Sequence, residues 1–142
     1  MKEKSYGVCL YRIVNNEFYI LLNRTSSVSE LNFFKGKIEN NETPKETAIR
    51  EFKEETNVLL EQKFLEKYFY SYQKRKDIGI YLYQYENIQN PNFNFCEKEI
   101  YSANWYKLSM LEDKHFSKNQ RKLFNDILLY LKNRFTINYL RT

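Results

Sequence analysis

The sequence predicts an α+β or α/β sandwich built on a mixed β-sheet. Runs of β-favouring residues are separated by two helical segments with capping signals, and one predicted strand is apolar on both faces. At 142 residues the chain is long enough for one domain, expected over residues 1–142. Hydrophobic residues make up 42% and charged residues 29%, which excludes a wholly disordered chain.

A β-hairpin is predicted near the N-terminus from residues 6–14 and 17–23. Asn15 and Asn16 join the two runs, and asparagine tolerates the positive φ angles that a tight hairpin turn requires. A polar loop and a short apolar run at 31–34 then lead to a glycine-containing segment.

A longer hairpin is predicted from residues 64–74 and 78–85, with its turn at 74–77. A short strand at 103–106 follows it. Because side chains alternate across a strand, the second arm has an aliphatic face and an aromatic face. The two sets are Ile78, Ile80 and Leu82 on one face and Tyr81, Tyr83 and Tyr85 on the other.

Two helices carry recognisable start signals. Thr43 and Glu46 form a capping box for a helix over residues 44–56. Ser117 and Gln120 have the same spacing and predict the start of a C-terminal helix. Its apolar stripe has the period of an α-helix: Leu123, Ile127, Leu128 and Leu131.

Three carboxylates crowd one side of the first helix. Glu51, Glu54 and Glu55 lie within one turn, where they repel each other and oppose the helix dipole. A solvated acidic face, partly neutralised by Arg50 and Lys53, is one interpretation. The other is a divalent-cation site, because hard cations bind oxygen ligands and would remove the repulsion.

Residues 36–58 read GKIENNETPKETAIREFKEETNV, which resembles the Nudix box, G-x5-E-x7-R-E-U-x-E-E-x-G-U, where U is an apolar residue. Eight positions match: Gly36, Glu42, Arg50, Glu51, Phe52, Glu54, Glu55 and Val58. Asn57 stands where the family usually has Gly, and asparagine is the next most tolerant residue of left-handed geometry. The chain is therefore similar to the Nudix (MutT-like) hydrolase family, and the resemblance implies an α/β/α sandwich with a mixed sheet.

The resemblance also implies a chemistry. Nudix enzymes use Mg²⁺ or Mn²⁺ to hydrolyse a pyrophosphate linkage in a nucleoside diphosphate joined to another group. Glu51, Glu54, Glu55 and the carbonyl of Gly36 are then the expected metal ligands. Arg50 is expected to hold a neighbouring glutamate in place, with a simple surface salt bridge as the alternative.

Three other carboxylates have less defined expected roles. Glu42 precedes the helix cap and is expected either to bind metal or to hold an arginine or amide. Glu99 is the preferred distal carboxylate, because it precedes Trp105 at roughly the family spacing, and Glu97 is the alternative. The general base varies across the family and stays open.

Substrate contacts are expected from aromatic and basic side chains. Tyr81, Tyr83 and Tyr85 form an aromatic face that can stack a nucleobase, and Tyr68, Tyr70 and Tyr72 can extend it. Packing in the core or on the sheet surface is the favoured interpretation of these tyrosines. Lys35 and Lys37 flank the glycine of the box and are expected to contact phosphate. The hairpin tip at 74–76 is basic, which suits a polyphosphate or RNA backbone or simply a soluble turn.

These features predict a Mg²⁺-dependent Nudix pyrophosphohydrolase. The FFKGK run resembles the FPKGK or FPKGH segment of diadenosine-polyphosphate hydrolases and mRNA-decapping Nudix enzymes. The favoured substrates are therefore dinucleoside polyphosphates, such as diadenosine tetraphosphate, or 5′-triphosphorylated or capped RNA. The alternatives are a (d)NTP pyrophosphatase that sanitises the nucleotide pool, and a Nudix-fold binding module without catalysis.

Composition limits the remaining possibilities. Cys9 and Cys96 are far apart, which excludes a zinc ribbon or disulfide scaffold. The net charge of +5 is spread along the chain and is only weak support for a nucleic-acid partner. The N-terminal apolar stretch is interrupted by Arg12 and Asn15, so neither a signal peptide nor a membrane span is predicted. A cytoplasmic location is expected, and the sequence gives no oligomeric state.

Overall fold

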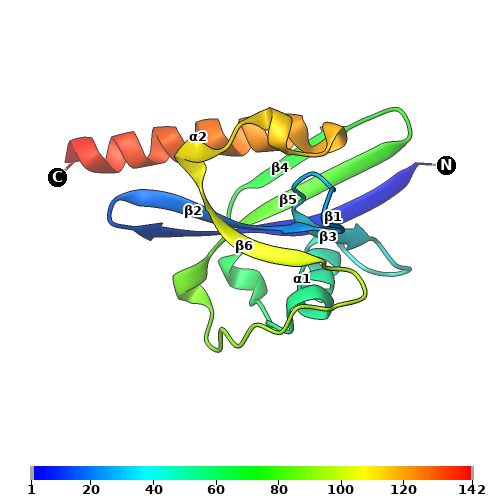
Figure 1. The fold of residues 1–142 in the computed structure, drawn as a ribbon. Coiled ribbons are helices and arrows are strands. Elements are labelled where there is room, and N and C mark those ends of the chain that lie inside the picture. The colour runs from blue at the N-terminus through cyan, green and yellow to red at the C-terminus, as the bar shows by residue number, and fades with distance from the viewer. Residues whose placement is uncertain (1, 142) are drawn as a thin grey trace.

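The structure, a computed structural model, describes residues 2–141, with side chains described through Arg134. A mixed six-stranded sheet lies between two helices, one on each face (Figure 1). The strand order is β4-β5-β1-β2-β6, with β3 pairing β1, and β1 and β5 are the parallel pair. The predicted α/β/α sandwich is therefore confirmed. The elements are β1 Glu3–Val14, β2 Glu17–Arg24, β3 Phe34–Lys37, α1 Pro44–Thr56, β4 Tyr68–Tyr72, β5 Lys76–Gln84, β6 Ser102–Lys107 and α2 Arg121–Arg141.

The N-terminal hairpin forms as predicted. Asn15 and Asn16 adopt φ angles of 51° and 64°, so both central residues of the turn are left-handed. β1 starts earlier than predicted, at Glu3, because this end of the strand pairs with both β3 and β5. No helix within the described residues is long and apolar enough to cross a bilayer.

Helix α1 begins and ends where the sequence predicts. The Thr43 hydroxyl accepts a hydrogen bond from the Glu46 backbone N–H at 3.2 Å, and the Glu46 carboxylate accepts one from the Thr43 N–H at 2.8 Å. Asn57 closes the helix in a left-handed conformation with φ of 66°. Phe52 is fully buried beneath the helix and packs edge-on against Phe34 of β3, with ring centroids 5.5 Å apart.

The sheet separates two apolar cores, and β5 contributes to both. Its aliphatic residues face α2, whereas Tyr81 and Tyr83 face the α1 side. The predicted alternation is therefore confirmed, and both faces are buried because β5 lies inside the sheet. The core on the α2 side includes Ile78, Ile80, Leu82, Leu123, Phe124 and Ile127.

The second hairpin is shorter than predicted. Residues Gln62–Phe64 form a turn of 3₁₀ helix, and Phe64 packs edge-on against Tyr83 instead of extending β4. The backbone N–H of Gln73 donates to the carbonyl of Lys76 at 2.8 Å, so only two residues separate the paired positions. The predicted turn at 74–77 was therefore wrong by two residues, because β5 already begins at Lys76.

The capping box predicted for the C-terminal helix is wrong. Ser117 makes no side-chain cap, and Lys118–Gln120 form a 3₁₀ turn before α2. The Gln120 amide instead accepts from the backbone N–H of Phe33 and donates to Asn32, both at 2.8 Å. The Ser117 hydroxyl also donates to Asn32, at 2.8 Å. These side chains tie the segment before β3 to the segment before α2, and local spacing cannot reveal a contact 87 residues away along the chain.

Gly7 lies where β1 pairs with β3. A Cβ atom at this position would overlap the carbonyl oxygen of Phe34 and the backbone of Lys35. Because backbone atoms cannot yield without disturbing the pairing, we expect Gly7→Ala to lower the free energy of unfolding by about 2 kcal/mol. Thermal unfolding measures the loss. Gly79→Ala is the matched control, since its Cβ would meet only the movable ring end of Tyr68. Equal losses in both variants would contradict this explanation.

Candidate metal centre and active site

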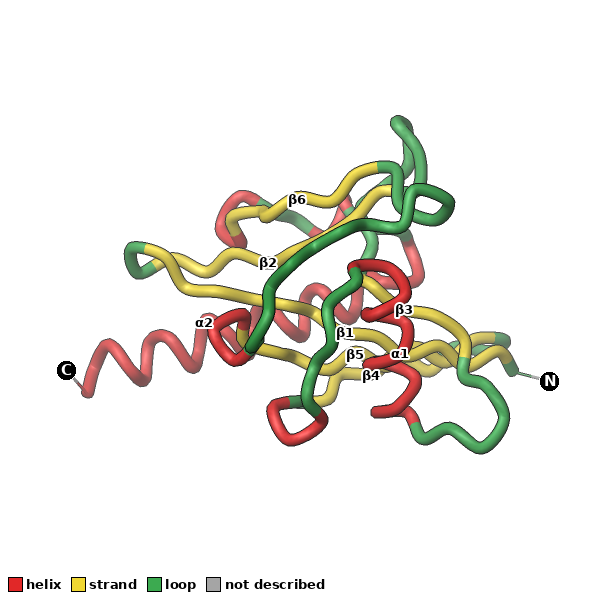
Figure 2. The backbone as a smooth tube through the Cα atoms, turned by 90° about the horizontal axis from the view of Figure 1, so that it is seen from below, coloured by secondary structure: helices red, strands yellow, loops and turns green. Residues whose placement is uncertain are grey.

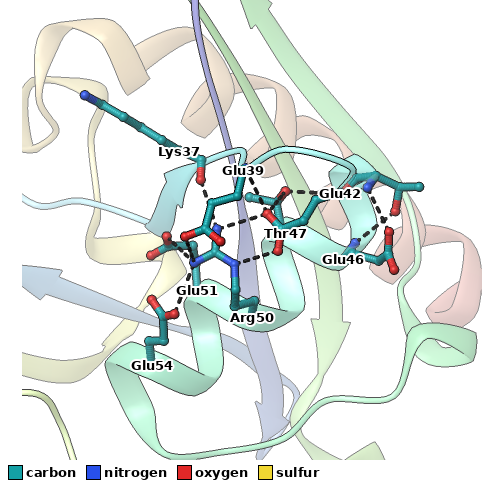
Figure 3. A network of polar contacts seen from close by, with 9 residues as sticks. Lys37, Glu39, Glu42, Glu46, Thr47, Arg50, Glu51 and Glu54 are labelled. Atoms are coloured by element: carbon teal, nitrogen blue, oxygen red, sulfur yellow. Dashed lines mark hydrogen bonds and ion pairs between the residues drawn. The ribbon is translucent and has the colours of Figure 1, made fainter.

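Arg50 is the hub of a polar network on α1 (Figure 3). Its Nε and Nη2 donate to the two carboxylate oxygens of Glu42, at 2.6 and 3.0 Å. Its Nη1 donates to Glu51 at 2.9 Å and to Glu54 at 3.1 Å. Nη2 also donates to the backbone carbonyl of Lys37 at 3.0 Å. One guanidinium therefore joins the loop before α1, the end of β3 and two of the three helix carboxylates.

Glu42 is fully occupied by protein donors. Besides Arg50, its carboxylate accepts from the backbone N–H of Glu39 at 3.0 Å and from the Thr47 hydroxyl at 2.9 Å. The bonds from Arg50 are the main reason that the pKa of Glu42 falls to about 2. Of the two roles predicted for Glu42, this geometry supports holding the arginine rather than binding metal.

The shifted pKa of Glu42 predicts an acid-dependent loss of stability. Its folded-state pKa of about 2 lies below the ordinary 4.5, so its stabilising contribution is present above pH 4.5 and disappears as the pH falls toward 2. We expect Glu42→Gln to be less stable at pH 7 and to lose less stability between pH 5 and pH 2. Thermal unfolding across that range checks this, with Glu97→Gln, an exposed position, as the control. Parallel curves for wild type and Glu42→Gln would exclude the linkage.

The Glu51 carboxylate lies directly against Gly36 of β3. A Cβ atom at residue 36 would overlap that carboxylate, so this glycine provides space and not a special backbone angle. Burial raises the pKa of Glu51, and the charge on Glu54 adds to this, although Arg50 opposes it. The contact brings a side chain of α1 against the backbone of β3.

Glu55 is the most deeply buried carboxylate of the cluster. Its residue is only 7% exposed, and its Oε1 atom has no hydrogen-bond partner among the described residues. Burial raises its pKa to about 9, and the charges on Glu51 and Glu99 contribute. A buried, unpartnered carboxylate oxygen among other carboxylates is suited to a bound cation.

A loop from another part of the chain adds Glu99 to this group. The backbone N–H of Cys96 donates to the carbonyl of Glu55, and that of Asn94 donates to Thr56, both at 2.9 Å. Glu99 lies in the following turn, and its charge raises the pKa of both Glu51 and Glu55. The sequence carries no signal for these bonds, because the loop donates them from its backbone.

The side chains of Lys35 and Lys37 do not join the hydrogen-bond network of Arg50, although the charge on Lys35 is close enough to Glu55 to oppose the rise in the pKa of that carboxyl. Side chains alternate along β3, so Lys35 and Lys37 lie on the sheet face opposite Gly36. Lys37 is exposed and its ammonium lies 3.4 Å from Glu3, while Figure 3 shows its side chain pointing away from Arg50. Burial and neighbouring Lys76 lower the pKa of Lys35 to about 8. Lys37 thus contributes its carbonyl oxygen to the network, and the expected contacts of the two lysines with phosphate stay predictions.

The two predicted stacking tyrosines are core residues. Tyr81 and Tyr83 are both buried on the α1 side of the sheet. The Tyr83 hydroxyl accepts from the Glu61 N–H at 3.2 Å and donates to the Asn87 carbonyl at 3.4 Å. Neither ring offers a free face to a nucleobase, so the core alternative holds for both.

The donor set suits a divalent metal, although Arg50 occupies part of it. Among the described residues no three Asp, Glu, His or Cys side chains form a ready metal-binding group. The reason is visible in Figure 3, where Glu51 and Glu54 both turn toward Arg50. The unpartnered oxygen of Glu55 and the oxygen-only ligands nevertheless fit Mg²⁺ or Mn²⁺.

Comparisons with known proteins agree with the fold. No match is found among curated protein sequences. The fold is similar to that of a C. elegans Ap4A hydrolase solved as a binary complex, at 20% identity and a TM-score of 0.68, covering 92% of this chain and 98% of that one. It is also similar to a structure from a study of MutT of Aliivibrio salmonicida and Vibrio cholerae, at 13% identity and a TM-score of 0.67, covering 89% and 96%. A sequence model of the NUDIX domain matches residues 3–127, and the chain therefore belongs to the Nudix family of pyrophosphohydrolases.

Proposed function

We propose that this protein uses a divalent metal, Mg²⁺ or Mn²⁺, to hydrolyse a pyrophosphate linkage in a nucleoside-diphosphate derivative. The observation that carries the proposal is the buried Glu55 carboxylate, which has an unpartnered oxygen and lies beside three other carboxylates. Keeping such a group ionised costs several kcal/mol unless a cation compensates it. Selection for stability alone would remove it.

The residues that would hold the metal are Gly36, through its carbonyl, with Glu51, Glu54 and Glu55. When bound, a divalent metal neutralises charge on phosphate oxygens and makes a bound water more acidic. Arg50 positions Glu51 and Glu54 through its hydrogen bonds. These contacts limit how far the carboxylates can turn, as expected for groups that orient metal ligands.

The proton from the attacking water needs a carboxylate that Arg50 does not hold. Glu55 and Glu99 are the members of the cluster without a bond to Arg50 among the described contacts. Glu99 is exposed on the loop, so it can change its orientation as substrate binds. Because Glu55 would hold the metal, we assign the proton-accepting role to Glu99, with Glu97, in the same turn, as the alternative distal carboxylate.

The substrates favoured by this proposal are dinucleoside polyphosphates, such as diadenosine tetraphosphate, and 5′-triphosphorylated or capped RNA. The FFKGK run and the fold shared with an Ap4A hydrolase support this class. The shared fold with a MutT structure supports the second candidate, a (d)NTP pyrophosphatase. The intact set of box carboxylates argues against a binding module without catalysis. A cytoplasmic location stays a prediction.

Product-resolved chromatography separates these possibilities. Purified protein is incubated with Mg²⁺ and a panel of diadenosine tetraphosphate, triphosphorylated and capped RNA, ordinary and oxidised dNTPs, ADP-ribose and NADH. A dinucleotide hydrolase yields two nucleotides, whereas a dNTP pyrophosphatase yields pyrophosphate and dNMP. Hydrolysis of at least one substrate, lost with EDTA, is the expected result. Tight binding of a panel member without turnover in Mg²⁺ or Mn²⁺ would overturn the proposal in favour of a binding module.

A further inference from the structure

Strand β4 carries a row of stacked tyrosines that the proposed metal centre does not use. Tyr68, Tyr70 and Tyr72 alternate along the strand and therefore share one face of the sheet. Their ring centroids are 6.0 and 4.6 Å apart in order, and the ring of Tyr81 of β5 lies tilted against Tyr68, 4.7 Å away. We name these four residues the tyrosine column. Its outer members remain open: Tyr70 is 49% exposed and Tyr72 is 60% exposed.

The column is open because of its place in the sheet. β4 is the outermost strand beside β5, and Figure 2 shows it at the border of the sheet. Helix α1 packs against β1, β3 and β5. The inner ring of Tyr68 is half-buried and covers Gly79, where a side chain would overlap it. The rings of Tyr70 and Tyr72, farther along β4, are exposed to solvent.

Cations surround the exposed end of the column. The Lys122 ammonium lies 5.4 Å from the Tyr70 ring centroid and donates to the Tyr70 carbonyl at 3.1 Å. The Lys2 ammonium lies 6.0 Å from the Tyr72 ring centroid. Lys74 and Arg75 are exposed at the hairpin tip, directly after the column. Asp77 forms an ion pair with Lys2, and Asp126 forms one with Lys122. The cations still outnumber these two carboxylates, so this surface has a net positive charge.

The column lies on the same sheet face as the proposed metal centre. Tyr70 pairs with Gly79, Gly79 pairs with Tyr6, and Tyr6 pairs with Gly36, so all four residues form one row across the strands. Three strand spacings separate Tyr70 from Gly36, which is about 14 Å. A chain bound at Gly36 can therefore reach the column after a few nucleotides.

We propose that the tyrosine column and its surrounding cations bind a single-stranded RNA segment. An unpaired base stacks on Tyr72 at the end of the column, and a neighbouring base contacts the exposed edge of Tyr70, whose ring lies between those of Tyr68 and Tyr72. Phosphates contact Lys2, Lys74 and Arg75. Aromatic rings flanked by cations match the alternation of base and phosphate in a single strand, whereas a duplex hides its base faces. The inference rests on the proposed function only in selecting the RNA class of substrate, since binding at the column needs no metal.

Fluorescence anisotropy tests the binding separately from hydrolysis. The probe is a 5′-labelled oligoadenylate of ten nucleotides, used in EDTA so that no metal-dependent turnover occurs. We expect the Tyr70→Ala/Tyr72→Ala double variant to raise Kd by about 10- to 100-fold. Tyr101→Ala is the matched control, because this tyrosine is 63% exposed and lies outside the column. Thermal unfolding confirms that all variants are folded.

The salt dependence supplies a second readout. Replacing Lys74 or Arg75 with alanine should lower the slope of log Kd against log salt by about 1 for each phosphate that no longer meets a cation. Equal weakening by Tyr101→Ala, equal affinity for the same strand in a duplex, or no binding by the wild type would each overturn the inference. Glu55→Gln should bind the oligonucleotide as the wild type does, so failure of hydrolysis and failure of binding remain distinguishable.

Discussion

Glu55→Gln is expected to lower kcat by about 1000-fold, equivalent to about 4 kcal/mol in the activation free energy. The substitution keeps the size of the side chain and removes the charge that would hold the metal. It also removes a carboxyl group whose buried position opposes the ionisation that it undergoes freely in the unfolded chain, so above about pH 5 the metal-free variant should be more stable than the wild type. Loss of activity with gain of stability distinguishes a functional carboxylate from a structural one.

The gain in stability should depend on pH. The folded-state pKa of Glu55 is about 9, above the ordinary 4.5, so the folded state holds the proton more tightly than the unfolded state does. The metal-free wild type therefore loses stability as the pH rises from about 5 to 9. At pH 8 we expect the free energy of unfolding of Glu55→Gln to exceed that of the metal-free wild type by about 2 kcal/mol, which raises Tm by about 6 °C. At pH 6 the difference should be smaller.

Thermal unfolding in EDTA at both pH values, then with added Mg²⁺, measures these effects. Mg²⁺ should stabilise the wild type and leave Glu55→Gln nearly unchanged. Glu54→Gln is the comparison, because its side chain is 52% exposed and its neutralisation should change the stability of the metal-free protein little. A Glu55→Gln protein that is less stable at pH 8, or that keeps full activity, would disprove the assigned role.

Removing Arg50 should produce the largest loss of stability. Arg50→Met leaves Glu42, Glu51 and Glu54 without their shared partner, and two of these carboxylates are largely shielded from water. We expect a loss of about 3 kcal/mol in the free energy of unfolding at pH 7. Hydrolysis should fall by about 10- to 100-fold, because the ligand carboxylates are no longer held. Arg50→Lys keeps the charge but not the two-pronged bond to Glu42, and should recover only part of either loss.

Denaturant unfolding and metal titration measure the two consequences of Arg50 substitution. Arg121→Met is the matched control, since Arg121 pairs with Glu30 at 3.3 Å across two half-exposed side chains. Such an exposed pair contributes no more than about 1 kcal/mol. If Arg50→Met lost no more stability than Arg121→Met, the network would be an ordinary surface salt bridge.

The sequence predicted the elements whose signals are local. The capping box of Thr43 and Glu46, the left-handed Asn57 and the asparagine turn of the first hairpin depend on neighbours within a few residues, and all are confirmed. The alternation along β5 was predictable for the same reason. The start of α2 was not, because Gln120 bonds to Phe33 across the fold instead of capping its own helix.

In the candidate site, too, the sequence predicts the features that depend on near neighbours in the chain and not those that depend on distant contacts. Sequence spacing brings Glu51, Glu54 and Glu55 together because they share a helix. It could not predict that Arg50 bonds to the carbonyl of Lys37, or that Tyr83 is buried in the core, since both depend on how β3 and β5 pair with β1. Local pattern thus predicts which groups are available, and strand pairing decides which of them meet.

The backbone bonds from Asn94 and Cys96 to the end of α1 have a consequence for motion. These bonds replace the solvent that would otherwise satisfy the last carbonyls of the helix. The loop cannot swing away without exposing those carbonyls, so it and the last turn of α1 form one cooperative unit of local unfolding. The loop that carries Glu99 therefore behaves as part of the scaffold and not as a lid.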